Sequence, residues 1–110
     1  MSLQIDNTYK NIPGWFNMEK QYLYLLKNTP ENGTFVELGA WKGKSTTFIV
    51  TEIINQNRKI NFYTIDLFKN DSNIMDEKEI AAYGKNYSIF EEYEKNTQHL
   101  ASHYKTIVSD

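Results

Sequence analysis

The side chains best suited to chemistry stand in and just after one stretch of the sequence, 33–54, which reads GTFVELGAWKGKSTTFIVTEII. An apolar run ends near the carboxylate of Glu37 and passes through Gly39 and Gly43 into a second apolar segment. A strand that turns through glycines into a helix places helix N–H groups beside the carboxyl end of the strand, where open α/β sheets bind nucleotide-like ligands. Another carboxylate, Asp66, ends the next strand-like run. Together these residues predict a binding site for a small cofactor.

One interpretation of the turn is a phosphate-binding P-loop. The segment GKST at 43–46 matches the end of that motif, and FYTID at 62–66 is similar to the strand and aspartate that help to hold its magnesium ion. A P-loop has four residues between its glycines, so that the backbone curls around a phosphate. Only three residues separate Gly39 from Gly43, and Leu38 stands where the motif has glycine. A P-loop-like nucleotide-binding module is therefore kept as the alternative and is not the preferred interpretation.

A nicotinamide dinucleotide site is the second interpretation, and it requires the pattern GxGxxG. Trp41 stands at the place of the middle glycine, and Glu37 would face a negatively charged pyrophosphate, so this interpretation is not preferred.

The third interpretation is a cofactor that carries positive charge and no phosphate. S-adenosylmethionine fits, because its ammonium and sulfonium groups are attracted to a carboxylate such as Glu37, and its own carboxylate accepts N–H bonds from a helix N-terminus. Asp66 would then accept hydrogen bonds from ribose hydroxyls.

The elements that position these residues alternate between helix and strand. The apolar spacing and the turn residues predict helices over 18–28, 44–57, 76–83 and 87–104, and strands over 34–38, 60–65 and 105–110. A strand, helix and strand within about 33 residues have the length of a βαβ unit, whose two strands are parallel. The first helix is expected to bury Met18, Tyr22, Leu25 and Leu26 on one face, and the second Phe48, Ile49, Val50, Ile53 and Ile54.

The predicted fold class is α/β, a Rossmann-like three-layer sandwich. Three strands make only the N-terminal half of a doubly wound parallel sheet, so the sheet is expected to be incomplete. Residues 1–11 are polar and predict an extended or poorly ordered arm, and residues 12–110 a partial Rossmann-like domain. The incomplete sheet predicts a fragment, a truncated gene product, or a homo-oligomer in which a second copy completes the sheet.

The segments FVELGAWKGKST at 35–46 and FYTIDLF at 62–68 resemble motifs I and II of class I S-adenosylmethionine-dependent methyltransferases. The likeness is greatest to a small-molecule subgroup in which an IPGWF-like segment, here 12–16, precedes the turn. This resemblance implies methyl transfer to an unidentified small-molecule acceptor, with residues beyond this chain needed to hold it. It also implies cofactor contacts by Glu37, Gly39, Ala40, Trp41, Gly43, Ser45, Asp66 and Leu67. No general base is identifiable, so no catalytic residue is assigned.

The composition excludes several other classes of function. Twelve Lys and Arg against fourteen Asp and Glu give a net charge of −2, so nucleic acid and anionic membranes are not the expected partners. The apolar runs are too short for a membrane span, and the absence of cysteine is compatible with the cytoplasm, the predicted location. His99 and His103 have a spacing that suits a metal, but no third ligand accompanies them, so no metal site is expected.

Interpretations without a ligand also exist for the same residues. Glu37 and Asp66 can each be a strand-end carboxylate that caps the N-terminus of the helix that starts near Ser45, and Lys42 and Lys44 are expected to be solvated. On that basis the chain would be a non-catalytic remnant that serves as an interaction domain.

Overall fold

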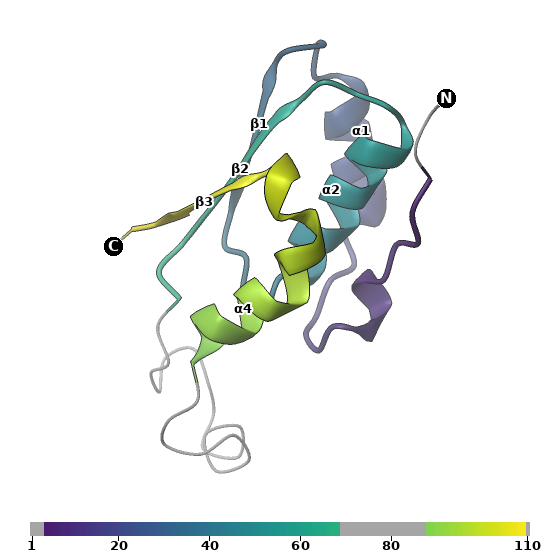
Figure 1. Ribbon diagram of the computed structural model, residues 1–110. Coiled ribbons are helices and arrows are strands. Elements are labelled where there is room, and N and C mark those ends of the chain that lie inside the picture. The colour runs from purple at the N-terminus through teal and green to yellow at the C-terminus, as the bar shows by residue number, and fades with distance from the viewer. Residues whose placement is uncertain (1–3, 69–87, 110) are drawn as a thin grey trace.

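The computed structural model describes residues 4–68 and 88–109, and the chain is a mixed α/β structure built on a parallel sheet (Figure 1). Its elements in chain order are η1 (Tyr9–Asn11), α1 (Glu19–Lys27), β1 (Thr34–Leu38), α2 (Lys44–Asn55), β2 (Asn61–Asp66), α4 (Ile89–Thr97), η2 (Gln98–His103) and β3 (Lys105–Val108). None of the helices in the described ranges is both long and apolar enough to cross a bilayer. The predicted helix over 76–83 lies outside the described residues.

The three strands are parallel and lie in the order β1-β2-β3. Thr34 is in register with Asn61 and Leu38 with Ile65, so β1 and β2 end side by side. β3 is shorter and pairs with the second half of β2, with Asp66 opposite Val108. The carboxyl ends of all three strands therefore lie at the same end of the sheet, as the βαβ pattern predicted.

The described helices lie on one face of this sheet (Figure 1). Phe35 and Phe62 point from β1 and β2 into that face and join the core of α1, α2 and η2. On the opposite face, Val36, Leu38 and Ile107 are exposed. The described part of the chain thus has two layers, where the sequence predicted three.

The core confirms most of the predicted buried positions. Phe48, Ile49, Val50 and Ile53 are buried in α2, and Ile54 is partly buried, as the helical spacing predicted. The prediction for α1 is wrong at two positions, since Met18 and Leu25 are exposed, and Leu23 packs against the core. Leu26 is the one fully buried residue of this short helix.

The predicted helix over 87–104 divides into two parts. Ser88 caps α4 by accepting a hydrogen bond from the Glu91 N–H, as helix N-caps do. The α-helix stops at Thr97, whose hydroxyl bonds to the Tyr93 carbonyl and the Tyr104 hydroxyl. A tighter 3₁₀ segment follows and places Leu100 in the core, which explains why the α-helix is shorter than predicted.

The described part of the N-terminal segment, from Gln4 on, lies along α2. The Asn55 side chain accepts from the Ile5 N–H at 2.8 Å and donates to the Ile5 carbonyl at 2.9 Å. The rings of Tyr9 and Phe48 pack edge to face, with centroids 4.8 Å apart. These contacts hold the described part of this segment along α2.

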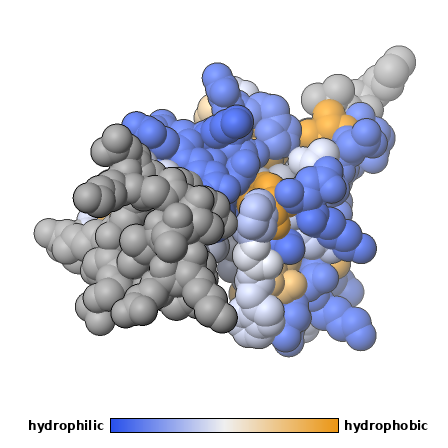
Figure 2. All heavy atoms as spheres, turned by 90° about the horizontal axis from the view of Figure 1, so that it is seen from below, coloured by the Kyte–Doolittle hydropathy of each residue, from blue (hydrophilic) through white to orange (hydrophobic). Residues whose placement is uncertain are grey.

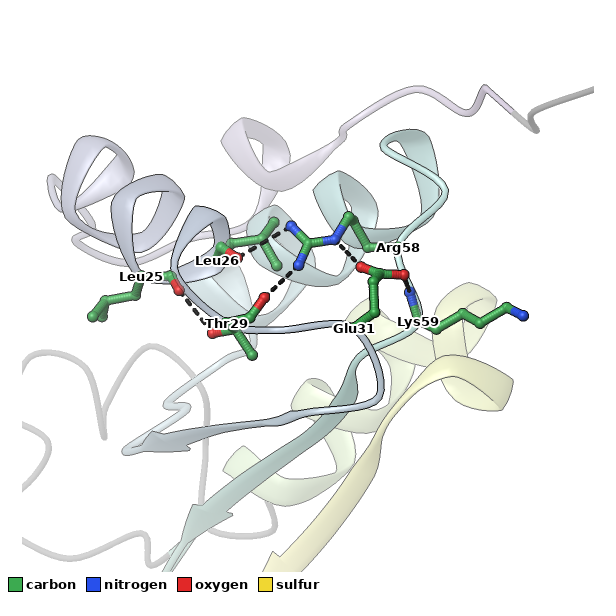
Figure 3. Close-up of polar contacts among 6 residues, drawn as sticks. All are labelled: Leu25, Leu26, Thr29, Glu31, Arg58 and Lys59. Atoms are coloured by element: carbon green, nitrogen blue, oxygen red, sulfur yellow. Dashed lines mark hydrogen bonds and ion pairs between the residues drawn. The ribbon is translucent and has the colours of Figure 1, made fainter.

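Arg58 ties the end of α1 to the turn before β1 (Figure 3). Its guanidinium donates to the carbonyls of Leu26 and Thr29 and forms an ion pair with Glu31. Glu31 also accepts from the Lys59 N–H at 3.0 Å. A guanidinium is suited to satisfying the free carbonyls at a helix C-terminus, so this contact has a structural explanation.

Candidate functional site

The glycine turn lies at the carboxyl end of β1, next to the end of β2. The Gly39 N–H donates to the Ile65 carbonyl at 2.8 Å, and the Gly43 N–H donates to the Ala40 carbonyl at 2.9 Å. Gly39 has φ 89°, Trp41 φ 52° and Gly43 φ 91°, so the turn passes three times through the left-handed region. This left-handed region favours glycine, which occupies the first and the last of these three positions. Helix α2 begins at Lys44, directly after Gly43.

Asp66 holds this turn through its carboxylate. Its Oδ2 accepts from the N–H groups of Ala40 at 2.6 Å and Trp41 at 2.9 Å, and its Oδ1 accepts from the Phe68 N–H at 3.0 Å. The structure thus brings Asp66 to the predicted turn, with a structural task there. A carboxylate has about four acceptor sites, so roughly one remains for a ligand hydroxyl.

Glu37 lies on the helical side of the sheet and is only 3% exposed. Its Oε2 accepts from the hydroxyls of Tyr22 at 2.8 Å and Ser45 at 2.6 Å. Its Oε1 accepts from the hydroxyls of Thr64, at 3.0 Å, and Thr46. Both oxygens are thus engaged by protein hydroxyls, and a ligand's ammonium group would have to displace them to reach the carboxylate.

The pKa of the Tyr22 phenol is raised in the folded chain, partly by its contact with Glu37. Burial raises the pKa of Tyr22 above its usual value, and the negative charge and hydrogen bond of Glu37 raise it further. An unfolded tyrosine ionises near pH 10, so the folded state holds this proton more tightly. The stability that Tyr22 adds is therefore complete below pH 10 or so and is lost as the pH rises through the folded pKa.

We expect Tyr22→Phe to weaken the fall in stability at alkaline pH. Above pH 10 or so, the free energy of unfolding should decrease less steeply in the variant, by up to about 1.4 kcal/mol per pH unit. Urea unfolding at several alkaline pH values measures this slope. Tyr93, whose pKa is also raised by burial, contributes equally in both proteins, so only the difference is assigned to Tyr22. Equal slopes would contradict a raised pKa of Tyr22 in the folded state.

The N-terminal segment lies against the glycine turn. The Trp41 ring is close to Gly14, where an added Cβ would stand 3.2 Å from the indole Cδ1. Lys44 donates from Nζ to the Gly14 carbonyl at 3.2 Å, and the Lys42 ammonium lies 5.6 Å from the Trp41 ring centre. Lys42 is only 3% exposed, so the prediction that it is solvated is wrong. Trp15 beside this contact is exposed.

Among the described residues, the surface above Gly39 is open. A Cβ built on Gly39 meets no heavy atom of these residues within 4 Å. Leu38, which precedes it, and Leu67, which follows Asp66, are both exposed. In Figure 2, which looks toward the end of the sheet at which β1 and β2 finish, the described residues are mostly hydrophilic with small separate hydrophobic areas. Two apolar side chains, an accessible backbone and a carboxylate thus share one small region.

The two histidines with metal-compatible spacing lie apart from this region. His99 and His103 are exposed on η2, and the described ranges contain no group of three side chains able to hold a metal ion. A hollow of about 310 Å³ lies near the amino ends of β2 and β3, beside Lys59, His103 and Lys105. It belongs to the end of the sheet opposite the glycine turn.

The sequence reasoning missed the hydroxyls that surround Glu37. Thr46 and Thr64 are fully buried, and Tyr22 reaches the carboxylate from α1. Strand alternation supplied a signal, because Glu37 stands two residues after the buried Phe35 and so faces the same side of the sheet. A carboxylate on the buried face needs hydrogen-bond partners, and hydroxyl residues were the available ones.

A scan against models of known protein families finds no match to this sequence, and a search of curated proteins finds no significant match either. A function therefore has to be inferred from the arrangement of the chain's own residues. That arrangement is a glycine turn at the ends of two parallel strands, with Asp66 beside it and open space above Gly39.

Proposed function

We propose that the chain binds S-adenosylmethionine at the glycine turn and forms the cofactor-binding part of a class I methyltransferase. In this proposal the sheet is the N-terminal half of a Rossmann-like, three-layer, doubly wound sandwich. When bound, the cofactor supplies an electrophilic methyl group that an oxygen or nitrogen nucleophile takes, leaving S-adenosylhomocysteine. The acceptor is a small molecule, and residues beyond this chain are expected to help hold it.

The observation that carries the proposal is the open space above Gly39 beside Asp66. An accessible glycine backbone lets a ligand approach closely, and the remaining acceptor site of Asp66 suits a ribose hydroxyl. The exposed side chains of Leu38 and Leu67 offer apolar contact to a base or a thioether. Glu37 is engaged by hydroxyls of α2 and β2, so the ligand's ammonium group would meet this carboxylate only by displacing some of them.

The same contacts disfavour a phosphate at the turn. The N–H groups of Ala40 and Trp41, which a phosphate would use, both donate to the Asp66 carboxylate. A phosphate there would lose those donors or face a like charge, and either is unfavourable. Lys44, at the position of the P-loop lysine, donates instead to the Gly14 carbonyl.

Calorimetry on the full chain tests the proposal directly. We expect S-adenosylmethionine and S-adenosylhomocysteine to bind and magnesium ATP not to bind. Binding of magnesium ATP alone would favour the nucleotide-binding alternative. Binding of none of the three would overturn the proposal and favour a non-catalytic interaction domain.

Asp66→Ala tests where the cofactor binds. We expect the affinity for S-adenosylhomocysteine to fall at least tenfold, about 1.4 kcal/mol, because the ribose hydroxyl loses its acceptor. Stability should fall as well, since three backbone N–H groups lose theirs. Titration calorimetry at low temperature, with folding checked by circular dichroism, separates the two effects.

Tyr22→Phe is the matched control for that experiment. It also removes a hydrogen bond and lowers stability, but it leaves Asp66 and the turn unchanged. We expect its affinity for S-adenosylhomocysteine to remain within about twofold of the original. An Asp66 variant that binds as well as this control would remove Asp66 from the site.

A further inference from the structure

A hollow lies at the end of the sheet opposite the glycine turn, near the amino ends of β2 and β3. Its volume of about 310 Å³ is at the lower end of the range for pockets that bind small molecules. Two of its lining residues, Ile53 of α2 and Phe62 of β2, are buried, and a third, Tyr104, is partly buried. The hollow therefore has room for a small organic ligand and offers apolar contact to its body.

One wall of the hollow carries a backbone donor without a partner. The strand β3 begins at Lys105, opposite Tyr63, so β2 extends beyond the start of β3 at Phe62. At the other end of these two strands the Asp66 carbonyl accepts from the Ser109 N–H, so the even-numbered residues of β2 direct their backbone groups toward β3. The N–H of Phe62 points the same way, but no carbonyl among the described residues accepts from it. An unpaired N–H at a buried residue is unfavourable, so this donor needs an acceptor from solution.

Three basic side chains border the same hollow. They are Lys59 in the segment before β2, His103 at the end of η2 and Lys105 at the start of β3. All three are exposed, and none forms an ion pair with another part of the chain that the structure describes. Arg58 also borders the hollow, but its charge is balanced by Glu31, and the Lys59 side chain extends away from that pair (Figure 3). The hollow is thus positively charged, and none of its described lining residues is acidic.

We propose that this hollow binds a small phosphorylated molecule, a phosphate monoester, through its phosphate group. The two lysines carry a positive charge each at neutral pH, which matches the roughly −1.5 to −2 of such a phosphate. The phosphate oxygens accept from the two ammonium groups, from the imidazole of His103 and from the free N–H of Phe62. The body of the ligand lies against Ile53 and Tyr104.

Other anions match these groups less well. A carboxylate carries one negative charge, so one of the two ammonium groups would remain without a counter-charge. It also has two oxygens, whereas a phosphate monoester presents three to the donors around it. Inorganic phosphate has the charge but no apolar body to contact Ile53 and Tyr104. These differences allow a titration to separate the three classes of ligand.

Titration of the full chain with phenyl phosphate at neutral pH, followed by NMR of the backbone amides, tests the site and the ligand class. We expect saturable shifts that are largest at Phe62, because its N–H gains an acceptor. Benzoate, with one charge, should bind at least about tenfold more weakly, and inorganic phosphate, without a ring, at least about fivefold more weakly. An unchanged Phe62 amide, or either of these two anions binding as tightly as phenyl phosphate, would overturn the proposal.

The variants Lys59→Gln and Lys105→Gln test whether the charges act at this place. Each is expected to lower the affinity for phenyl phosphate at least about fivefold, with an unchanged circular dichroism spectrum, because both side chains are exposed. The matched control is Lys20→Gln, which removes the same charge from an exposed position of α1 outside the hollow and should leave the affinity within about twofold. An equal loss of affinity in all three variants would show attraction by the overall charge and would overturn the site. No S-adenosyl compound is present in these titrations, so their outcome does not depend on the proposed cofactor site.

Discussion

Replacing Glu37 with alanine is expected to lower the free energy of unfolding by about 3 kcal/mol, the sum of two unsatisfied buried hydroxyls at roughly 1–2 kcal/mol each and a small cavity. Thr46 and Thr64 are fully buried and donate to this carboxylate, so they lose their acceptor without gaining water. Tyr22 and Ser45 lose theirs at a half-buried position, where water replaces part of the bond. The loss should be read from urea unfolding at neutral pH.

Glu37→Gln is the matched control, because it keeps the shape of the side chain. The amide oxygen still accepts, and the amide NH₂ can donate to hydroxyls that rotate to accept. We expect a loss of about 1 kcal/mol, the scale of one weakened hydrogen bond. An alanine variant as stable as the glutamine variant would mean that the hydroxyl network adds nothing to the fold.

The glutamine variant also separates two roles for Glu37. If the carboxylate only braces the turn, S-adenosylhomocysteine should bind Glu37→Gln within about twofold of the original affinity. If the carboxylate attracts the ammonium group of the ligand, removing its charge should weaken binding at least tenfold. The burial of Glu37 favours the first result.

The main elements could be predicted because their signals are local. The strand at Thr34–Leu38 and the helix from Lys44 follow from an apolar run, a pair of glycines and a helical spacing. The position of Asp66 beside the turn was predictable too, since neighbouring parallel strands finish at the same edge. The predictions that were wrong concern features that tertiary contacts determine. The end of α4 at Thr97 is set by a hydroxyl network with Tyr104 that no local pattern specifies.

The candidate site was predictable in position but not in the roles of its carboxylates. The motif placed Glu37 and Asp66 at strand ends, and charge alone favoured contacts with a ligand. Only the structure shows that Glu37 faces the helices and that Asp66 accepts from the turn itself. Two residues with the same charge thus have different surroundings, because Glu37 is paired within the sheet opposite Thr64, whereas Asp66 is the last residue of β2 and lies beside the glycine turn.

Replacing Gly43 with alanine is the second large effect that we expect, a loss of about 3 kcal/mol from backbone strain of roughly 1 kcal/mol and a clash of roughly 2 kcal/mol. Gly43 has φ 91°, and an added Cβ would stand 2.7 Å from Thr97 Cγ2 and 3.1 Å from Tyr93 Cδ2. Thr97 cannot easily turn away, because its hydroxyl is held by Tyr93 and Tyr104.

Gly39→Ala isolates the strain, because Gly39 has nearly the same φ, 89°, and open space around its Cβ position. We expect it to cost about 1 kcal/mol, the backbone term alone. Thr97→Ser isolates the clash, since it removes the methyl group that the Cβ added in Gly43→Ala would meet and keeps the hydroxyl. In a double-mutant cycle, Thr97→Ser should recover about 1 kcal/mol or more of the Gly43→Ala loss and nothing of the Gly39→Ala loss. Equal losses of unfolding free energy for the two glycine variants would mean that α4 moves to make room for the added methyl group. The packing of α4 on Gly43 would then not fix the shape of the site.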